Sequence, residues 1–222
     1  MEGMEKTKPI TGKKCIVVGA SPEECQTVWE PVRQEDAYLI CADGGLDKIL
    51  QAGLLPHLVV GDFDSSRCKI PEGVEQIRLP AEKDDTDLLF AVKEGLRRGY
   101  RDFQILGALG ARLDHSYANF GILQYISQQN GTGMLEDDAT CVYLLDARKK
   151  HLFLEDCEGM TISVFPFAAP SCTLTYEGMR YPLDREVLSS NFPRGISNVI
   201  AHPCAKITVH EGQALVMLMK RI

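Results

Sequence analysis

The sequence has no long hydrophobic run, and this absence excludes several classes of protein. No apolar run approaches the roughly 18 residues that a membrane span needs, so we expect no membrane partner. The first residues, Met1 to Lys6, are polar and lack the apolar core of a signal peptide. We therefore expect a cytosolic (cytoplasmic) protein with a short loose N-terminus over residues 1–12.

Positive charge is also scarce, which argues against nucleic acid as a partner. The chain has 24 Lys and Arg residues against 31 Asp and Glu residues, a net charge of −7. An acidic surface attracts neither nucleic acid nor an anionic membrane. The 222 residues are 45% hydrophobic and 25% charged, as in an ordinary globular protein with one large or two modest domains.

Cysteine pairs with metal-ligand spacing are missing as well. The eight cysteines are scattered without a C-x-x-C motif or the spacing of a zinc site. Cys15, Cys41 and Cys141 lie inside predicted strands, where a free thiol behaves as a small hydrophobe. The chain also has no P-loop, no G-x-G-x-x-G motif and no Ser–His–Asp order, which disfavours Walker-type and Rossmann dinucleotide sites.

Strand and helix patterns alternate over the first part of the chain. Strand-like runs occur at 14–19, 38–42, 58–61, 74–79 and 103–107. A helical pattern covers residues 22–34, and further helical patterns follow up to about residue 129. Such alternation predicts a mostly parallel sheet flanked by helices. From about Met134 to Ile222 only strand-like runs appear, as in a sandwich or barrel, and they lie at 141–145, 151–154, 161–165, 172–176, 206–209 and 214–218. The predicted fold is an α/β domain over 13–133 followed by an all-β domain over 134–222.

The stretch that ends the third strand carries the first chemical signal. Asp62 and Asp64 follow Gly61, and side chains at i and i+2 of an extended chain point to the same side. Two carboxylates about 4 Å apart repel by about 4 kcal/mol at an effective dielectric near 20. The pair therefore favours a cation such as Mg²⁺ or Ca²⁺, although Gly, Asp and Ser are also common in a plain solvated turn.

Other carboxylates follow neighbouring strands of the same predicted sheet. Asp43 and Gly44 come after the second strand, and Asp84, Asp85 and Asp87 open a helix. Loops after parallel strands emerge at one edge, so these groups can converge on a metal–phosphate site. Acids in the first helical turn also suit the helix dipole alone, and Asp-Gly-Gly is also a common turn.

The last helix of the first domain begins with a basic residue. Arg112 offers a planar fork matched to phosphate, at a helix N-terminus that favours anions. His115 and Asn119 are one helical turn apart and share a face. His115 could act as a base, but a capping or packing role is the more common one for such a histidine.

Five separated motifs together resemble the thiamine pyrophosphokinase family across nearly the whole chain. The motifs are Ala42-Asp43-Gly44-Gly45, Gly61-Asp62-Phe63-Asp64-Ser65, Lys83-Asp84-Asp85-Thr86-Asp87, Arg112-Leu113-Asp114-His115 with Asn119, and Gly195-Ile196-Ser197-Asn198. The resemblance implies a C-terminal β-sandwich that binds thiamine and a homodimer with its active site near the subunit interface. It also implies Mg²⁺-dependent transfer of pyrophosphate from ATP to the thiamine hydroxyl, which releases AMP.

The resemblance also assigns roles to single residues. The catalytic carboxylates would be Asp62, Asp64, Asp84 and Asp87, of which Asp62, Asp64 and Asp84 would hold Mg²⁺. The ATP-binding residues would be Asp43, Gly44, Arg112, Asp114 and Asn119. The thiamine-binding residues would be Ser197, Asn198 and Tyr181. The chain departs from the family pattern at Ala111, where glycine is common, and at Val199, where an acid is common.

Three other classes of protein share part of this motif pattern. An aspartyl phosphatase has D-x-D, but usually after its first strand, and a metal-dependent glycosyltransferase has D-x-D without the partner motifs. A thiamine- or nucleotide-binding sensor would keep the pocket and lose turnover. In the pyrophosphokinase reaction itself, Asp84 or Asp87 could accept the hydroxyl proton.

Overall fold

The computed structural model describes residues 13–21, 26–34, 36–63, 68–80, 84–110 and 112–220. The chain divides into two compact units, Met1–Asp138 and Ala139–Ile222. The boundary predicted between residues 133 and 134 falls inside a strand, β6 (Thr132–Glu136). Because β6 pairs in parallel with β5 (Asp102–Leu106) of the first unit, the division between the units comes after β6. The observed architecture confirms the predicted fold class of an α/β part followed by a β-sandwich.

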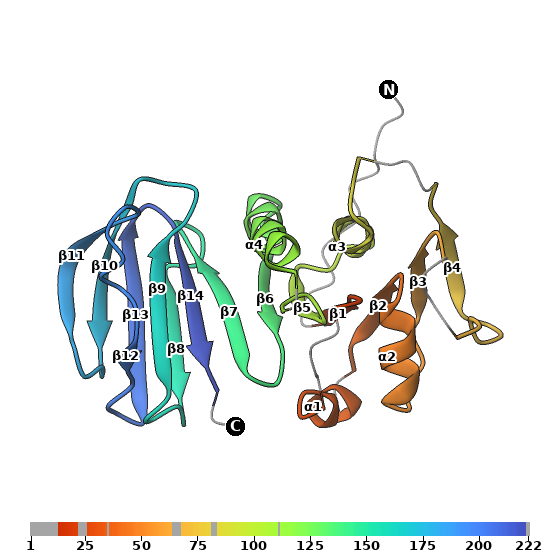
Figure 1. Ribbon diagram of the computed structural model, residues 1–222, viewed down its shortest axis with the longest axis horizontal. Helices are drawn as coiled ribbons and strands as arrows, with labels where there is room; N and C mark the ends of the chain where they lie inside the picture. Colours follow the sequence, from red (N-terminus) through yellow and green to blue (C-terminus); the bar gives the residue numbers. More distant parts are fainter. Residues whose placement is uncertain are drawn as a thin grey trace. The chain divides into compact units, whose positions relative to one another are not determined.

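The first unit is a parallel sheet with helices on both faces. The sheet order is β6-β5-β1-β2-β3-β4, and every pairing in it is parallel. Figure 1 shows α1 and α2 on one side of this sheet and α3 and α4 on the other. The elements are β1 (Lys14–Val18), α1 (Trp29–Gln34), β2 (Tyr38–Ala42), α2 (Gly45–Gln51), β3 (Leu58–Gly61), β4 (Glu75–Arg78), α3 (Asp87–Arg97), β5 (Asp102–Leu106) and α4 (Leu113–Gln128).

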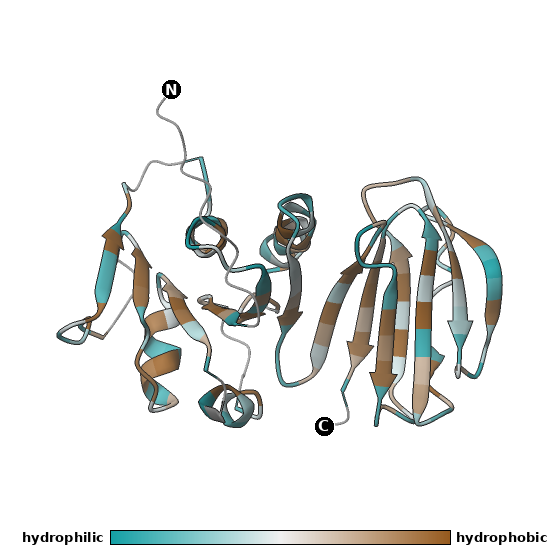
Figure 2. Cartoon of the chain, turned by 180° about the vertical axis from the view of Figure 1, so that it is seen from behind, coloured by the Kyte–Doolittle hydropathy of each residue, from teal (hydrophilic) through white to brown (hydrophobic). Residues whose placement is uncertain are grey.

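The central strands are apolar because both of their faces are covered. On β1, Ile16 and Val18 belong to the hydrophobic cluster that also contains Trp29 of α1 and Leu46 of α2. Cys15 lies on the opposite face, close to Gly95 of α3. The edge strand β4 is mostly exposed, and Figure 2 shows it as largely hydrophilic beside the hydrophobic β3. Charged residues on an edge strand discourage pairing with another chain.

Helix boundaries follow from local capping. Thr86 caps α3, and its side chain accepts a hydrogen bond from the Leu89 N–H at 3.2 Å. The helix predicted over residues 22–34 begins later, at Trp29; residues 22–25 lie outside the described part of the chain. The Asp138 carboxylate accepts from the N–H groups of Gln26 and Thr27 at 2.7 and 2.9 Å. These residues form a turn held by Asp138.

The second unit is an antiparallel sandwich of two sheets. One sheet contains β12-β9-β14-β7, and the other has the order β11-β10-β13-β8. Alternate side chains of both sheets meet in one core, and Figure 2 shows the resulting bands along the strands. Its strands are β7 (Thr140–Leu145), β8 (His151–Glu155), β9 (Thr161–Pro166), β10 (Ser171–Glu177), β11 (Leu183–Ser189), β12 (Asn198–Val199), β13 (Cys204–Glu211) and β14 (Ala214–Met219).

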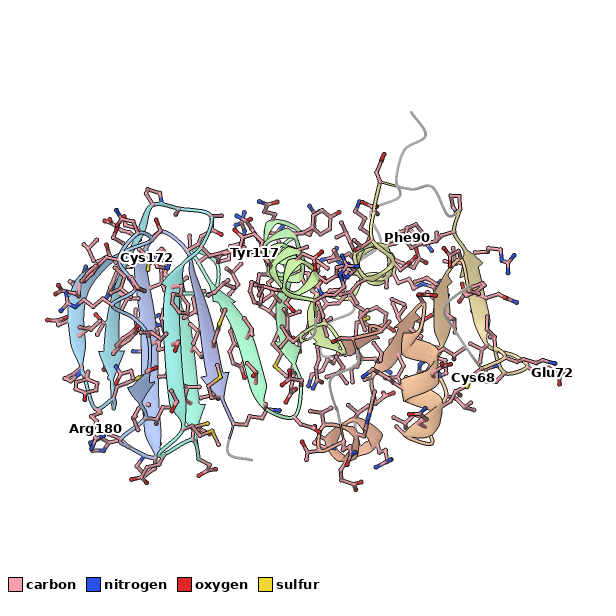
Figure 3. The ribbon with its side chains drawn as sticks, viewed as in Figure 1. Cys68, Glu72, Phe90, Tyr117, Cys172 and Arg180 are labelled. Carbon is pink, nitrogen blue, oxygen red and sulfur yellow. The ribbon has the colours of Figure 1, made fainter. Side chains whose placement is uncertain are left out.

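The cysteines of the predicted strands behave as the sequence predicts, whereas Cys68 and Cys204 are exposed. Cys15, Cys41, Cys141 and Cys172 are buried free thiols, and Figure 3 labels Cys172 on β10. Burial raises the pKa of the Cys172 thiol to about 11, so it is protonated and unreactive at neutral pH. Among the helices that the structure describes, none is both long and apolar enough to cross a membrane.

Gly45 provides a test of how tightly α2 packs on β1. A Cβ at this position would lie 2.1 Å from the carbonyl oxygen of Val18. We predict that Gly45→Ala lowers the free energy of unfolding by at least about 1–3 kcal/mol, the usual cost of overpacking a core. Urea-induced unfolding followed by circular dichroism measures this difference.

Gly121 in α4 is the matched control, because a Cβ there would meet nothing within 4 Å. Alanine is the better helix former, so Gly121→Ala should raise stability by about 0.5–1 kcal/mol. Equal stability changes in the two variants would contradict the packing described for Gly45.

Candidate functional site

A cavity of about 640 Å³ lies at the carboxyl edge of the parallel sheet. It is lined by the segments that follow β1, β2 and β5 and by the first turns of α3 and α4; these are residues 19–21, 42–43, 86–88, 107–110 and several residues from 112 to 119. β1 lies between β2 and β5, and the chain leaves β1 and β5 toward helices on opposite faces (Figure 1). Ligands of open α/β sheets bind at this kind of switch point.

The loops that follow β1 and β5 cross closely at this switch point. The Gly19 N–H donates to the Leu106 carbonyl at 2.8 Å, and the Ser21 N–H donates to the Gly107 carbonyl at 2.9 Å. Gly107 has a φ of +60°, and a Cβ on it would lie 2.4 Å from the Gly19 carbonyl oxygen. Only glycine permits both the conformation and the approach. The Ser21 hydroxyl also donates to the Leu109 carbonyl, which joins the two loops again.

Asp43 presents a carboxylate oxygen that the described residues leave unsatisfied. Its backbone is in the left-handed region, with a φ of 47°, and its N–H donates to the Val60 carbonyl at 2.8 Å. Its Oδ1 is buried and has no hydrogen-bond partner among the described residues. An unsatisfied buried polar group costs about 1–3 kcal/mol. A cation or a ligand donor in the cavity would remove that cost.

The acidic residues before α3 divide between the cavity and the surface. Asp87, the first residue of α3, is half-buried and lines the cavity. Asp84 is exposed and is not a lining residue. Asp85 forms an ion pair with Lys93, with 2.6 Å between Oδ2 and Nζ. Asp87 is therefore the member of this cluster that faces the same cavity as Asp43.

The structure does not place the two carboxylates that follow β3 at the cavity. Asp62 is half-buried at the end of β3 but is not among the lining residues, and Asp64 lies outside the described residues. Gly44 caps α2 and does not line the cavity. Within the described ranges, no group of three or more His, Cys, Asp or Glu side chains could by itself hold a metal ion. The metal-binding roles of Asp62, Asp64 and Asp84 stay predictions.

The start of α4 brings charge to the cavity. Arg112 Nε and Nη2 lie 3.1 and 2.5 Å from the carboxylate oxygens of Asp114. The Arg112 guanidinium lowers the pKa of Asp114 to about 2, so the pair is ionised at neutral pH. His115 lines the cavity and is exposed, and Arg112 rather than His115 occupies the cap position. His115 therefore neither caps this helix nor packs in the core.

Asn119 and Ser116 hold the loop after β5. Asn119 is buried, and its Nδ2 donates to the Ala108 carbonyl at 2.7 Å. Ser116 Oγ accepts from the Gly110 N–H at 3.1 Å. Both residues line the cavity. Their hydrogen bonds hold the backbone of the loop that forms its wall. Ser21 and Ser116 are not among the predicted site residues, because the only sequence signal for them is the glycines that follow β1 and β5.

The three predicted thiamine-binding residues lie in the second unit, and two of them are in direct contact. The buried Asn198 side chain accepts from the Tyr181 N–H at 3.1 Å, although the residues are 17 positions apart. Tyr181 itself is 63% exposed. Ser197 is exposed with a φ of 58°, and its N–H donates to Ser163 Oγ at 3.1 Å.

The cavity suits a polyphosphate together with a cation. The first turns of α3 and α4 line it, and helix N-termini favour anions; Arg112 adds a positive charge matched to phosphate. The Asp43 and Asp87 carboxylates repel a bare anion but attract a cation that accompanies it. Mg²⁺ is usually held by one or two carboxylates plus substrate phosphates, and the donors described here match that pattern.

Comparison with known proteins gives a consistent result. The thiamin pyrophosphokinase catalytic domain matches residues 29–134, and the vitamin B1 binding domain of the same enzymes matches residues 149–214. Thiamine pyrophosphokinase of Bacillus subtilis (strain 168) is 29% identical over 195 residues, covering 86% of this chain and 91% of that protein. Thiamine pyrophosphokinase 1 of Oryza sativa subsp. japonica is 25% identical over 214 residues, covering 84% and 79%.

Solved structures share the fold. The crystal structure of thiamine pyrophosphokinase from Bacillus subtilis has a TM-score of 0.83 at 23% identity, covering 95% of this chain and 100% of that one. Thiamin pyrophosphokinase from Candida albicans has a TM-score of 0.79 at 14% identity, covering 94% and 89%. The two domain matches extend over most of the chain, and the chain therefore belongs to the thiamine pyrophosphokinase family, whose enzymes transfer pyrophosphate from ATP to thiamine.

Proposed function

We propose that this chain transfers the pyrophosphoryl group of ATP to the hydroxyl of thiamine, giving thiamine diphosphate and AMP. The observation that carries the proposal is the cavity at the switch point, lined by Asp43, Asp87 and Arg112. Most of its lining lies in the segment that matches the family's catalytic domain. We propose that ATP binds in this cavity, with its phosphates near the first turns of α3 and α4.

The acidic side chains support a requirement for Mg²⁺. The unpartnered Oδ1 of Asp43 is a hard oxygen donor at the cavity, and Asp87 faces the same space. We propose that these carboxylates, together with the family-pattern residues Asp62, Asp64 and Asp84, hold Mg²⁺ with the phosphates of ATP. Bound Mg²⁺ would neutralise phosphate charge.

The reaction needs positioning more than covalent help. The thiamine hydroxyl attacks the β-phosphorus, and the oxygen that bridges to the α-phosphorus leaves with AMP. Arg112 would stabilise the charge that develops on the phosphate oxygens, and its pair with Asp114 orients its guanidinium. Of the two carboxylates considered as proton acceptor, Asp87 is favoured because it lines the cavity and Asp84 does not.

Identification of the nucleotide product tests the proposed function. The purified chain is incubated with ATP, Mg²⁺ and thiamine, and the products are separated by chromatography. We expect AMP and thiamine diphosphate in equal amounts. ADP would indicate a different phosphotransferase, free phosphate would indicate a phosphatase, and binding without any product would indicate a sensor. Each of these results would contradict the proposal.

The Asp43 carboxylate gives a sharper prediction about Mg²⁺. Asn is nearly the same size but has no charge, so Asp43→Asn should fold normally and lower kcat by about 10²-fold or more, in the range seen for removal of one electrostatic catalytic group. It should also require more Mg²⁺ for half-maximal activity. Thermal unfolding and Mg²⁺ titrations measure both effects.

Asp102→Asn is the matched control, because Asp102 is exposed at the amino end of β5, at the opposite edge of the sheet. It should keep the activity and the Mg²⁺ requirement of the unaltered chain. Unchanged kinetics in Asp43→Asn would remove Asp43 from the site.

We also propose that the chain forms a homodimer, as the family resemblance implies. Both units expose large apolar side chains: Leu113 is 82% exposed and Tyr117 is 68% exposed on α4, and Phe192 is 66% exposed in the sandwich. Figure 3 labels Tyr117 on α4. Light scattering should give about twice the 24.6 kDa chain mass, and a monomer mass at assay concentrations would contradict the proposal.

A further inference from the structure

Asp85 belongs to the acidic motif before α3, but a lysine binds its carboxylate and it does not line the cavity. Both of its oxygens accept from the Lys93 Nζ, Oδ1 at 2.7 Å and Oδ2 at 2.6 Å, although the two residues are eight positions apart. Lys93 lies about 9 Å beyond Asp87 along the helix axis, at a rise of 1.5 Å per residue. Because helical side chains lean toward the N-terminus, Lys93 reaches back to the chain that enters α3.

The entry of the chain into α3 lacks two devices that commonly fix it. A hydrophobic staple pairs an apolar residue before the cap with one at the fourth helical position; here Asp85 precedes the cap residue Thr86, and Phe90 is at the fourth position. A capping box needs Glu or Gln at the third helical position, where this chain has Leu89. The ion pair of Asp85 and Lys93 therefore takes the place of the staple.

Lys93 also contacts the neighbouring helix α4. Its Nζ lies 5.7 Å from the centroid of the Tyr125 ring, a distance at which an aromatic face attracts a cation. Figure 1 shows α3 and α4 on the same side of the sheet, and the first turns of both helices line the cavity. Side-chain exposure is 30% for Asp85 and 37% for Lys93. An ion pair this exposed contributes little to stability, so stability does not explain why it joins these elements.

We propose that Asp85 and Lys93 are positioning residues, which fix the chain where it enters α3 and thereby hold Asp87 at the cavity. This inference rests on the proposed function, in which Asp87 helps to hold Mg²⁺ and accepts the hydroxyl proton. Thr86 and Asp87 directly follow Asp85, and both line the cavity. A misplacement of about 1 Å in a catalytic group can lower the rate by about 10²-fold, so an ion pair outside the cavity can control the reaction.

Single variants of the two residues test the positioning role. Lys93→Met removes the charge but keeps an unbranched side chain beside Tyr125, and Asp85→Ala removes the carboxylate. Each should lower kcat by about 10- to 100-fold and leave the KM for thiamine unchanged. The melting temperature should shift by no more than about 2–4 °C, because the pair is exposed. Lys93→Arg keeps the charge and should keep kcat. An unchanged kcat in Lys93→Met would overturn the inference.

A double-mutant cycle separates positioning from direct contact. Asp85→Ala in the Lys93→Met background should lower kcat no further, because the ion pair through which both residues act is already broken. Additive losses would show that Asp85 acts on Mg²⁺ or on ATP without Lys93, and would overturn the positioning role. Should Asp85→Ala not fold, Asp85→Asn replaces it in the cycle.

Asp36→Asn is the matched control. It breaks another exposed lysine–carboxylate pair, in which Asp36 Oδ2 also lies 2.6 Å from the Nζ of Lys13. This pair lies before β1 and β2, at the opposite edge of the sheet from the cavity. Asp36→Asn should keep kcat, and an equal loss in this variant would contradict a specific role for Asp85 and Lys93.

The outcomes also separate this inference from the proposed function. If the unaltered chain makes no thiamine diphosphate, the proposed function is wrong and the inference fails with it. If it makes thiamine diphosphate and Lys93→Met does so at the same kcat, only the inference is wrong. Thermal unfolding is measured for every variant. A loss of activity that only follows the loss of folded protein would show a structural role and would overturn the inference.

Discussion

The close crossing of the loops after β1 and β5 is the constraint on which the site depends. The Gly107 and Gly19 backbones approach so closely that neither position has room for a Cβ, and two backbone hydrogen bonds and the Ser21 hydroxyl close the contact. Because β1 and β5 send the chain to opposite faces of the sheet, the cavity opens where these loops part. The strand order therefore determines where a ligand binds, and the glycines make that place narrow and rigid.

Two features of Asp43, which lines the cavity, are energetically unfavourable in the folded protein, and a functional role explains them. Asp43 combines a left-handed backbone with a buried carboxylate oxygen that lacks a described partner. Each feature is unfavourable in the unliganded protein, and such features concentrate at functional sites. The ion pair of Arg112 and Asp114, in contrast, lies at an exposed helix start, where it orients the guanidinium and contributes little to stability. The carboxylates of Asp43 and Asp114 thus serve different purposes.

The sequence was sufficient for the central sheet and for part of the site. Strands such as 38–42 were recognised because a run of buried apolar residues between turn residues has few alternatives. Asp43, Asp87 and Arg112 were expected at one sheet edge and do line one cavity. β6 was missed because its Gly133 weakens the strand pattern; a Cβ there would lie 3.0 Å from Ile126 of α4. β11 was missed because its outward residues are charged and only one of its faces packs.

The two asparagines show why motifs alone do not give the role of a residue. Asn119 and Asn198 both belong to family motifs, and both were expected to contact a substrate. Both are buried, and both bind main chain: Asn119 holds the Ala108 carbonyl, and Asn198 holds both backbone groups of Tyr181. Asparagine can match the donor and acceptor of a peptide group at once, so a motif can require it in order to fix a loop. Such a role depends on contacts between distant residues, which a motif does not reveal. A substitution at either position would therefore disturb the loop that the asparagine holds.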